Sequence, residues 1–213
     1  MSEKSSLLIS REIGLTKKLE LLIIEKLLHE VHFTEKEMKF LIKFHKKYSN
    51  DDLFIEKPDF LQMLHEELGY TEHFFMNRVF VQADTNRDGR IGLEEFIRLM
   101  SILLRGSQEE KIKFCFNCYD LNETSQLTRE VIILLLNQTS TEAADTHPDL
   151  VLDLLEMVLK KMDLDGDGVL SFEEFKSSAS EDWIMMEAFG QCLPDYKCHI
   201  AFLNTMSKSS EGK

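Results

Sequence analysis

The sequence has no apolar run long enough to cross a membrane. Among its 213 residues the longest such run is VIILLL, from Val131 to Leu136, whereas a membrane-spanning helix needs about 20 apolar residues. The opening segment, MSEKSSLLISREIG, has too short an apolar core for a signal peptide, and Ser2 stands where N-myristoylation requires glycine. We therefore expect a cytoplasmic protein with no direct membrane anchor.

Positive charge is also scarce. The chain has 25 Lys and Arg against 38 Asp and Glu, which gives a formal net charge of −13. A surface of this sign repels the phosphates of nucleic acids and anionic membranes, and it attracts metal cations and basic peptides. The composition therefore predicts no nucleic-acid partner.

Cysteines are few, and the motifs of enzymes are missing. Cys115 and Cys118 form a Cys-x-x-Cys, but no second pair follows at zinc-ligand spacing, although Cys192, Cys198 and His199 lie near the C-terminus. Small apolar side chains of a helix in a reducing compartment explain this pair better than the alternative, a metal or redox site. The sequence has no nucleophile elbow, phosphate loop or His-Glu-x-x-His, so we expect no enzyme.

Two twelve-residue segments match a calcium-binding loop. DTNRDGRIGLEE, residues 84–95, and DLDGDGVLSFEE, residues 163–174, both fit D-x-[DN]-x-[DN]-G-x5-E. In such a loop oxygens at positions 1, 3 and 5 converge on the ion, position 7 offers its backbone carbonyl, and Glu at position 12 binds with both oxygens. The predicted ligands are Asp84, Asn86, Asp88, Arg90 and Glu95 in one loop, and Asp163, Asp165, Asp167, Val169 and Glu174 in the other.

Two weaker copies complete a fourfold repeat. Segments that begin at Tyr48 and at Asp120 lie at equal spacing on either side of Asp84. Once the four copies are aligned, position 8 is aliphatic in all of them, and apolar residues precede and follow each loop at helical spacing. The repeat predicts an all-α fold of four EF-hand helix-loop-helix units, whose loops pair through their position-8 residues, Ile55 with Ile91 and Leu127 with Leu170.

The loop from Asp120 keeps only part of the ligand set. Asp120, Asn122 and Thr124 occupy positions 1, 3 and 5. Ser125 replaces glycine at the turn, where a positive φ costs a non-glycine residue about 1 kcal/mol, and Val131 removes both oxygens of position 12. We expect a weak or lost metal site there, in the third hand.

The first hand is degenerate, because Tyr48 stands at position 1, Leu53 at the turn and the shorter Asp59 at position 12. The prediction is therefore two strong calcium sites, with magnesium as an alternative occupant at rest. The loop from Asp163 offers four carboxylates and the loop from Asp84 offers three, with Arg87 nearby, so we expect tighter binding in the fourth hand.

Helix-start signals divide the chain. Thr34 with Glu37, Ser107 with Glu110, and Ser171 with Glu174 have the spacing of capping boxes.

The remaining signals mark a hinge and a loop. Gly106 is the expected hinge, and Pro148 suits the first turn of a helix. The segment from Asn137 to Leu150 is expected to be a loop. The expected regions are an N-terminal helical segment (1–33), an N-terminal EF-hand lobe (34–105), a C-terminal EF-hand lobe (106–190) and a C-terminal helical extension (191–213).

Both ends of the chain contain an amphipathic stretch. The first places Leu15, Leu19, Leu22, Ile23 and Leu27 on one helix face. This face either packs on the N-terminal lobe, which we favour, or binds a partner. The second stretch, DYKCHIAFLNTM, is a candidate to occupy the apolar groove of its own molecule.

Four strings resemble the calaxin family, the axonemal calcium sensors of cilia and flagella. They are MNRVFVQAD, LLRGSQEEKIKFCFNCYDLN, LKKMDLDGDGVLSF and, most specific, MEAFGQCLPD. The resemblance runs from about Thr34 to Asp195. It implies a calcium sensor that regulates or docks outer-arm dynein in the axoneme of motile cilia and flagella, with the dynein heavy chain or its docking complex on doublet microtubules as protein partner.

The third hand departs from that pattern, since calaxins generally have a binding-competent loop where this chain has Ser125 and Val131. The departure points to a divergent relative. Two other functions stay open: a constitutive structural component of the axoneme, and a generic cytosolic calcium sensor or regulatory subunit with a different target.

Overall fold

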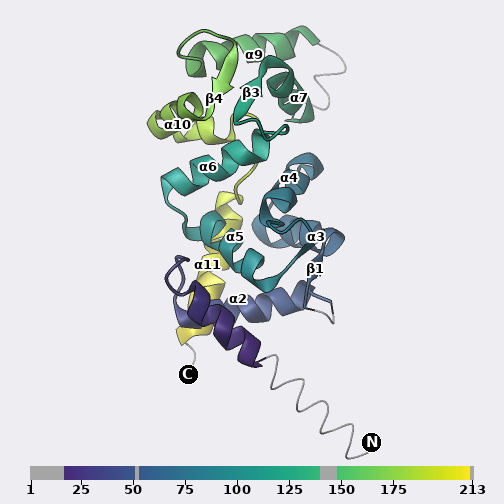
Figure 1. The fold of residues 1–213 in the computed structure, drawn as a ribbon, viewed down its shortest axis with the longest axis vertical. Coiled ribbons are helices and arrows are strands. Elements are labelled where there is room, and N and C mark those ends of the chain that lie inside the picture. The colour runs from purple at the N-terminus through teal and green to yellow at the C-terminus, as the bar shows by residue number, and fades with distance from the viewer. Residues whose placement is uncertain (1–16, 51–52, 140–147, 212–213) are drawn as a thin grey trace, which may run out of the picture.

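The computed structural model describes residues 17–50, 53–139 and 148–211. Helices dominate, which confirms the predicted all-α EF-hand class. The chain forms two stacked lobes, and its C-terminal segment returns from the second lobe to the first, so that α11 lies beside α2 (Figure 1). No described helix is long and apolar enough to cross a membrane.

The N-terminal lobe consists of two helix-loop-helix units, preceded by a helix over residues 17–27. Its elements are α2 (Glu35–Tyr48), β1 (Ile55–Glu56), α3 (Lys57–Leu68), α4 (His73–Ala83), β2 (Arg90–Ile91) and α5 (Leu93–Arg105). The C-terminal lobe contains α6 (Gln108–Tyr119), β3 (Gln126–Thr128), α7 (Arg129–Thr139), α9 (Pro148–Met162), β4 (Val169–Ser171) and α10 (Phe172–Glu181). A 3-10 helix, Trp183–Glu187, and α11 (Tyr196–Glu211) follow.

The predicted capping boxes start three of these helices. The Thr34, Ser107 and Ser171 side chains each accept the backbone N–H three residues on, and the Glu at that position returns a carboxylate to the cap. These contacts satisfy N–H groups that the first helical turn leaves free. The prediction is confirmed at all three helices.

The loops pair as the position-8 residues predict. Ile55 lies opposite Ile91 and Leu127 lies opposite Leu170, in two antiparallel pairings. All four side chains are fully buried. Each lobe is therefore held together through an apolar contact between its two loops, and this contact does not depend on bound metal.

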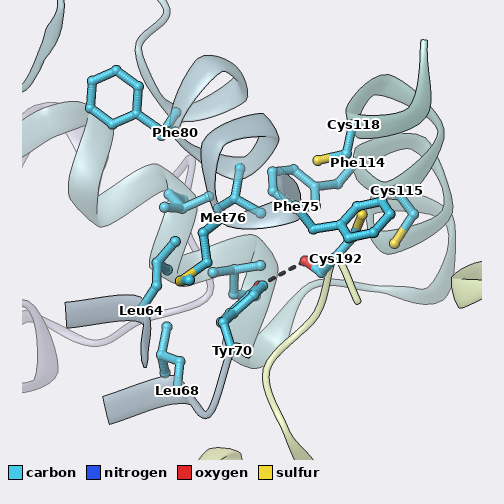
Figure 2. Packing of buried hydrophobic residues seen from close by; sticks show 14 of the residues in the cluster. Leu64, Leu68, Tyr70, Phe75, Met76, Phe80, Phe114, Cys115, Cys118 and Cys192 are labelled. Carbon is cyan, nitrogen blue, oxygen red and sulfur yellow. Dashed lines mark hydrogen bonds between the residues drawn. The ribbon is translucent and has the colours of Figure 1, made fainter. Parts of the chain in front are cut away.

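A segment that we call the strap, residues 182–195, fastens the lobes to each other. The Tyr70 hydroxyl donates to the Cys192 carbonyl at 2.7 Å (Figure 2), and the Tyr119 hydroxyl donates to the Gly190 carbonyl at 2.6 Å. A Cβ on Gly190 would lie 2.2 Å from the Phe75 ring. Glycine is therefore required there, because the strap passes directly over an N-terminal-lobe side chain.

After the strap, α11 packs on the N-terminal lobe. Phe202 makes edge-to-face contacts with Phe40 and Phe44, with ring centroids 5.9 and 4.9 Å apart. His199 Nε2 lies 2.9 Å from the Leu104 carbonyl oxygen. Phe202 and Met206 are buried, at 5% and 0% exposed, so the C-terminal helix forms part of the core.

Two expectations need correction. The N-terminal helix buries Ile23, Ile24 and Leu27, whereas Leu19 and Leu22 are each 52% exposed, because the helix contacts the lobe along a narrower stripe than the predicted face; Leu15 lies outside the described residues. The loop expected from residue 137 to residue 150 overlaps two helices, because α7 continues to Thr139 and α9 starts at Pro148. Residues 140–147 lie outside the described part of the chain.

Candidate calcium centres

The loop between α4 and α5 holds its oxygen ligands with its own backbone. The Asp84 carboxylate accepts the N–H groups of Asp88 at 3.0 Å and Gly89 at 2.8 Å. Asn86 Oδ1 accepts the N–H of Asp88 at 2.8 Å, and Asp88 Oδ1 accepts that of Arg90 at 2.9 Å. These contacts turn the side-chain oxygens of positions 1, 3 and 5 toward the inside of the loop.

Glu95, at position 12, links this loop to the start of α5. Its Oε1 accepts the N–H of Asn86 at 3.2 Å and the hydroxyl of Thr85 at 2.9 Å. Its Oε2 accepts the N–H of Gly92 at 2.9 Å, which closes a cap on the helix. Glu95 is 9% exposed, and its carboxylate already contacts the loop that it would complete.

The loop between α9 and α10 has the same construction. Asp163 Oδ2 accepts the N–H of Gly168 at 2.9 Å, Asp165 Oδ1 that of Asp167 at 3.1 Å, and Asp167 Oδ1 that of Val169 at 2.7 Å. Gly168 has a φ of +80° at the turn, a conformation that glycine adopts without a steric penalty. The turn therefore folds without backbone strain.

The fourth hand fits a calcium ion well. Among the described residues, the only group of three acidic, His or Cys side chains whose ligand atoms lie within 4.8 Å of one another is Asp163, Asp165 and Glu174. Calcium binds oxygens at about 2.3–2.6 Å, so a single ion placed between these oxygens can reach all three. Burial opposes ionisation of Glu174, but hydrogen bonds from Ser171 and from the N–H of Leu164 outweigh it and lower the pKa of Glu174.

The third loop keeps its shape without that carboxylate. Both Asp120 oxygens are used, one by the N–H of Thr124 at 3.1 Å and the other by that of Ser125 at 2.7 Å. Ser125 has a left-handed φ of +59°, in the same region as the turn glycines of the two complete loops, Gly89 at +82° and Gly168 at +80°. Val131 is 6% exposed in the core, and Glu130 points to solvent. Asp120, Asn122 and Thr124 therefore lack a position-12 ligand.

The first loop is built around other contacts. Tyr48, at position 1, directs its hydroxyl away to the Glu67 carboxylate at 2.7 Å. Leu53 adopts a φ of +65° at the turn. An apolar side chain at that turn and a phenol at the first ligand position give calcium few oxygens to bind.

The second and third hands are tied together. Arg87 donates to both carboxylate oxygens of Glu123 at 2.7 Å. On α4, Arg78 donates to the carbonyls of Cys118 at 2.8 Å and Asp120 at 3.0 Å, at the C-terminal end of α6. We call these contacts the interlobe clasp, and they place a candidate calcium loop against the impaired one.

The sequence patterns did not identify Arg78, because nothing near it in the chain indicates that it reaches a helix end in another hand. For Arg87 and Glu123 a signal exists. Both stand at position 4 of their loops, and opposite charges at equivalent positions of two repeats are a simple indication of contact.

Known proteins share this organisation. A family model of an EF-hand domain pair matches residues 109–180, and a model of an EF hand matches residues 76–100. Calaxin of Xenopus laevis is 37% identical over 179 residues, which cover 80% of this chain and 86% of that protein. The chain belongs to the calaxin family. Human calaxin is 39% identical over 150 residues, or 70% of this chain and 71% of that protein.

A calcineurin subunit from Candida glabrata is also similar, with 32% identity over 159 residues, 73% of this chain and 87% of that protein. The calaxin-family chain is thus a calcium-binding EF-hand protein. The string MEAFGQCLPD, on which the resemblance to calaxins depended most, lies within the strap. The most characteristic part of this calaxin-family sequence is therefore the joint between its lobes.

Proposed function

We propose that this protein is a calcium-switched regulator or dock of outer-arm dynein in the axoneme of motile cilia, acting through the second and fourth hands. Two loops carry the proposal: each has side-chain oxygens at positions 1, 3, 5 and 12, and each ends in a Glu that also caps the next helix. Membership of the calaxin family supports the axonemal setting and a protein partner.

Glu95 and Glu174 connect ion binding to helix position. In each loop the carboxylate holds the N–H at the start of its helix and one or two N–H groups of the loop. A bound calcium ion supplies a charge that attracts both carboxylate oxygens. A turn of Glu95 and Glu174 toward the loop centre would change these hydrogen bonds and would shift α5 and α10 relative to their partner helices.

An apolar cavity lies beside the second hand. It measures about 430 Å³, and its lining includes Ile23, Ile42, Phe54 and Leu93, together with Glu95. A movement of Glu95 therefore changes the wall of an apolar site directly. The acidic charge of the chain fits a partner helix with apolar anchors and basic flanks.

The proposal is tested by recovery of partners from an axoneme extract on the immobilised protein, with calcium or with a chelator. We expect dynein heavy chain or docking-complex subunits only with calcium, and loss of that recovery in the E95Q/E174Q double variant. E173Q is the matched control, because Glu173 is exposed beside the ligand Glu174. Recovery that is equal with and without calcium contradicts a calcium switch.

Two observations favour other functions. The strap and the clasp hold the lobes together without metal, as suits a constitutive structural component of the axoneme, and such a component would retain its partner in the chelator. The similarity to a calcineurin subunit favours a cytosolic regulatory protein with a different target. In that case the axoneme extract would yield no dynein under either condition.

A further inference from the structure

Three of the four cysteines meet inside the molecule. Cys115 and Cys118 lie on α6, and Cys192 comes from the strap, some 70 residues later in the chain. All three are fully buried, and the Cys192 side chain lies between the other two (Figure 2). The side chains of Cys115 and Cys118 both interact with that of Cys192.

This cluster is suited to thiol chemistry. Its sulfurs are absent from the one described group whose ligand atoms converge within 4.8 Å. Cys192 of the strap interacts separately with Cys115 and with Cys118, both of which lie on α6. The predicted calcium ligands include none of these thiols. For Cys115 and Cys118 the sequence favoured a role as small apolar side chains, with a metal or redox role as the alternative.

We propose that Cys192 is a peroxide-sensitive thiol that forms an intramolecular disulfide with Cys115 or Cys118 and so locks the strap onto α6. Cys192 first attacks hydrogen peroxide, whose O–O bond breaks to give a sulfenic acid and hydroxide. The α6 thiol then attacks the sulfenic sulfur, the S–O bond breaks and water leaves. In sum, two thiols and one peroxide give one disulfide and two waters.

The electrostatics favour Cys192 as the attacking group. Burial opposes ionisation of Cys192, but its interactions with the side chains of Cys115, Cys118 and Tyr119 lower the pKa of Cys192, whereas burial raises the pKa of Cys115. A thiolate, not a thiol, reacts with peroxide. A sulfenic acid on Cys192 would therefore form next to an α6 thiol that can resolve it.

The link would act on the joint between the lobes. The backbone of Cys192 is held by Tyr70 on one side and by the Glu187 carboxylate, which accepts its N–H at 3.0 Å, on the other. Helix α11 starts four residues later, at Tyr196. A disulfide at Cys192 would keep the strap closed and hold the start of α11 on the N-terminal lobe.

Peptide mass spectrometry under non-reducing conditions tests the proposal after treatment of the full chain with excess hydrogen peroxide. Trypsin separates Cys192, in residues 177–197, from Cys198, in residues 198–208, and places both α6 cysteines in residues 114–129. We expect 177–197 linked to 114–129 in a monomer, with the link removed by dithiothreitol. The oxidised monomer should also unfold at a higher Tm than the reduced one.

The matched control is the C198S variant, which lacks the half-buried fourth cysteine. On oxidation this variant should still lose two free thiols. C192S should form no such link. If C192S fails to fold, the C115S/C118S variant replaces it. This variant has no α6 thiol to resolve Cys192, so Cys192 should remain a sulfenic acid that dimedone traps. Links that contain Cys198, a Cys115–Cys118 link alone, or no loss of thiols would each overturn the proposal.

Discussion

At position 12 of the third loop, Val131 is 6% exposed and packs in the core of the C-terminal lobe. The neighbouring Glu130 faces solvent on another side of α7. Ser125 nevertheless takes the backbone conformation of the missing glycine. The loop has therefore kept the geometry of a calcium loop and lost one decisive ligand.

A third calcium site should be recoverable by S125G/V131E. The double variant restores the glycine turn and the bidentate carboxylate, so calorimetry should show one more calcium ion bound than in the parent. Without calcium it should be less stable by about 1–3 kcal/mol, because a carboxylate replaces a buried apolar group. V131Q is the control, since it has the length of Glu but a weaker ligand; an unchanged stoichiometry in S125G/V131E would contradict the interpretation.

The two complete loops should differ in affinity. The fourth hand brings three carboxylates within 4.8 Å of one another. In the second hand Arg90 lies 3.8 Å from the predicted ligand Asp88 and offsets part of its negative charge. In the E95Q variant only the fourth hand should still bind calcium tightly, and in the E174Q variant only the second hand. We expect the Kd of the fourth hand to be about tenfold lower, a difference of about 1.4 kcal/mol. Calorimetry of the two variants that gives equal or reversed Kd values would refute this order.

At the scale of elements, α11 covers the N-terminal lobe through Phe202 and Met206. Truncation before Pro194 should expose the faces of α2 and α3 that α11 covers, and binding of a hydrophobic dye should rise. The free energy of unfolding should fall by roughly 3–6 kcal/mol, from about 1.5–3 kcal/mol for each of the two buried side chains. N204A is the control, because Asn204 lies on the exposed face of the same helix; unchanged dye binding after truncation would rule out a covering role.

At the scale of the whole molecule, the clasp and the strap decide how the lobes sit. Arg78 is half-buried and bonded to the end of α6, while the Arg87–Glu123 pair is exposed, at 75% and 57% of its side chains. We expect R78A to lower the free energy of unfolding by about 1.5–3 kcal/mol, the usual worth of charged hydrogen bonds. R87A should change it little and in a salt-dependent way. Urea titrations of both variants provide the measurement, and equal effects would contradict the distinction.

The sequence predicted the repeat and the two loops that match the calcium-binding pattern. It also predicted the capping boxes at Thr34, Ser107 and Ser171 and the pairings Ile55–Ile91 and Leu127–Leu170. Each of these depends on residues close together in the chain or on a repeated register, and short-range hydrogen bonding and periodic burial act over those same distances. The sequence did not predict which apolar residues of the N-terminal helix stay exposed, because the packing of the neighbouring helices decides how much of the apolar stripe is covered.

Only the tertiary structure placed Arg78 on the end of α6, Gly190 against Phe75, and Cys192 between Cys115 and Cys118. These contacts join segments that lie from 40 to more than 100 residues apart, and no local pattern encodes such partners. The sequence by itself determined how each hand is built and which loops retain calcium ligands. The packing of distant segments decided how the two lobes are held together, because burial and hydrogen bonding between them depend on how the whole chain closes.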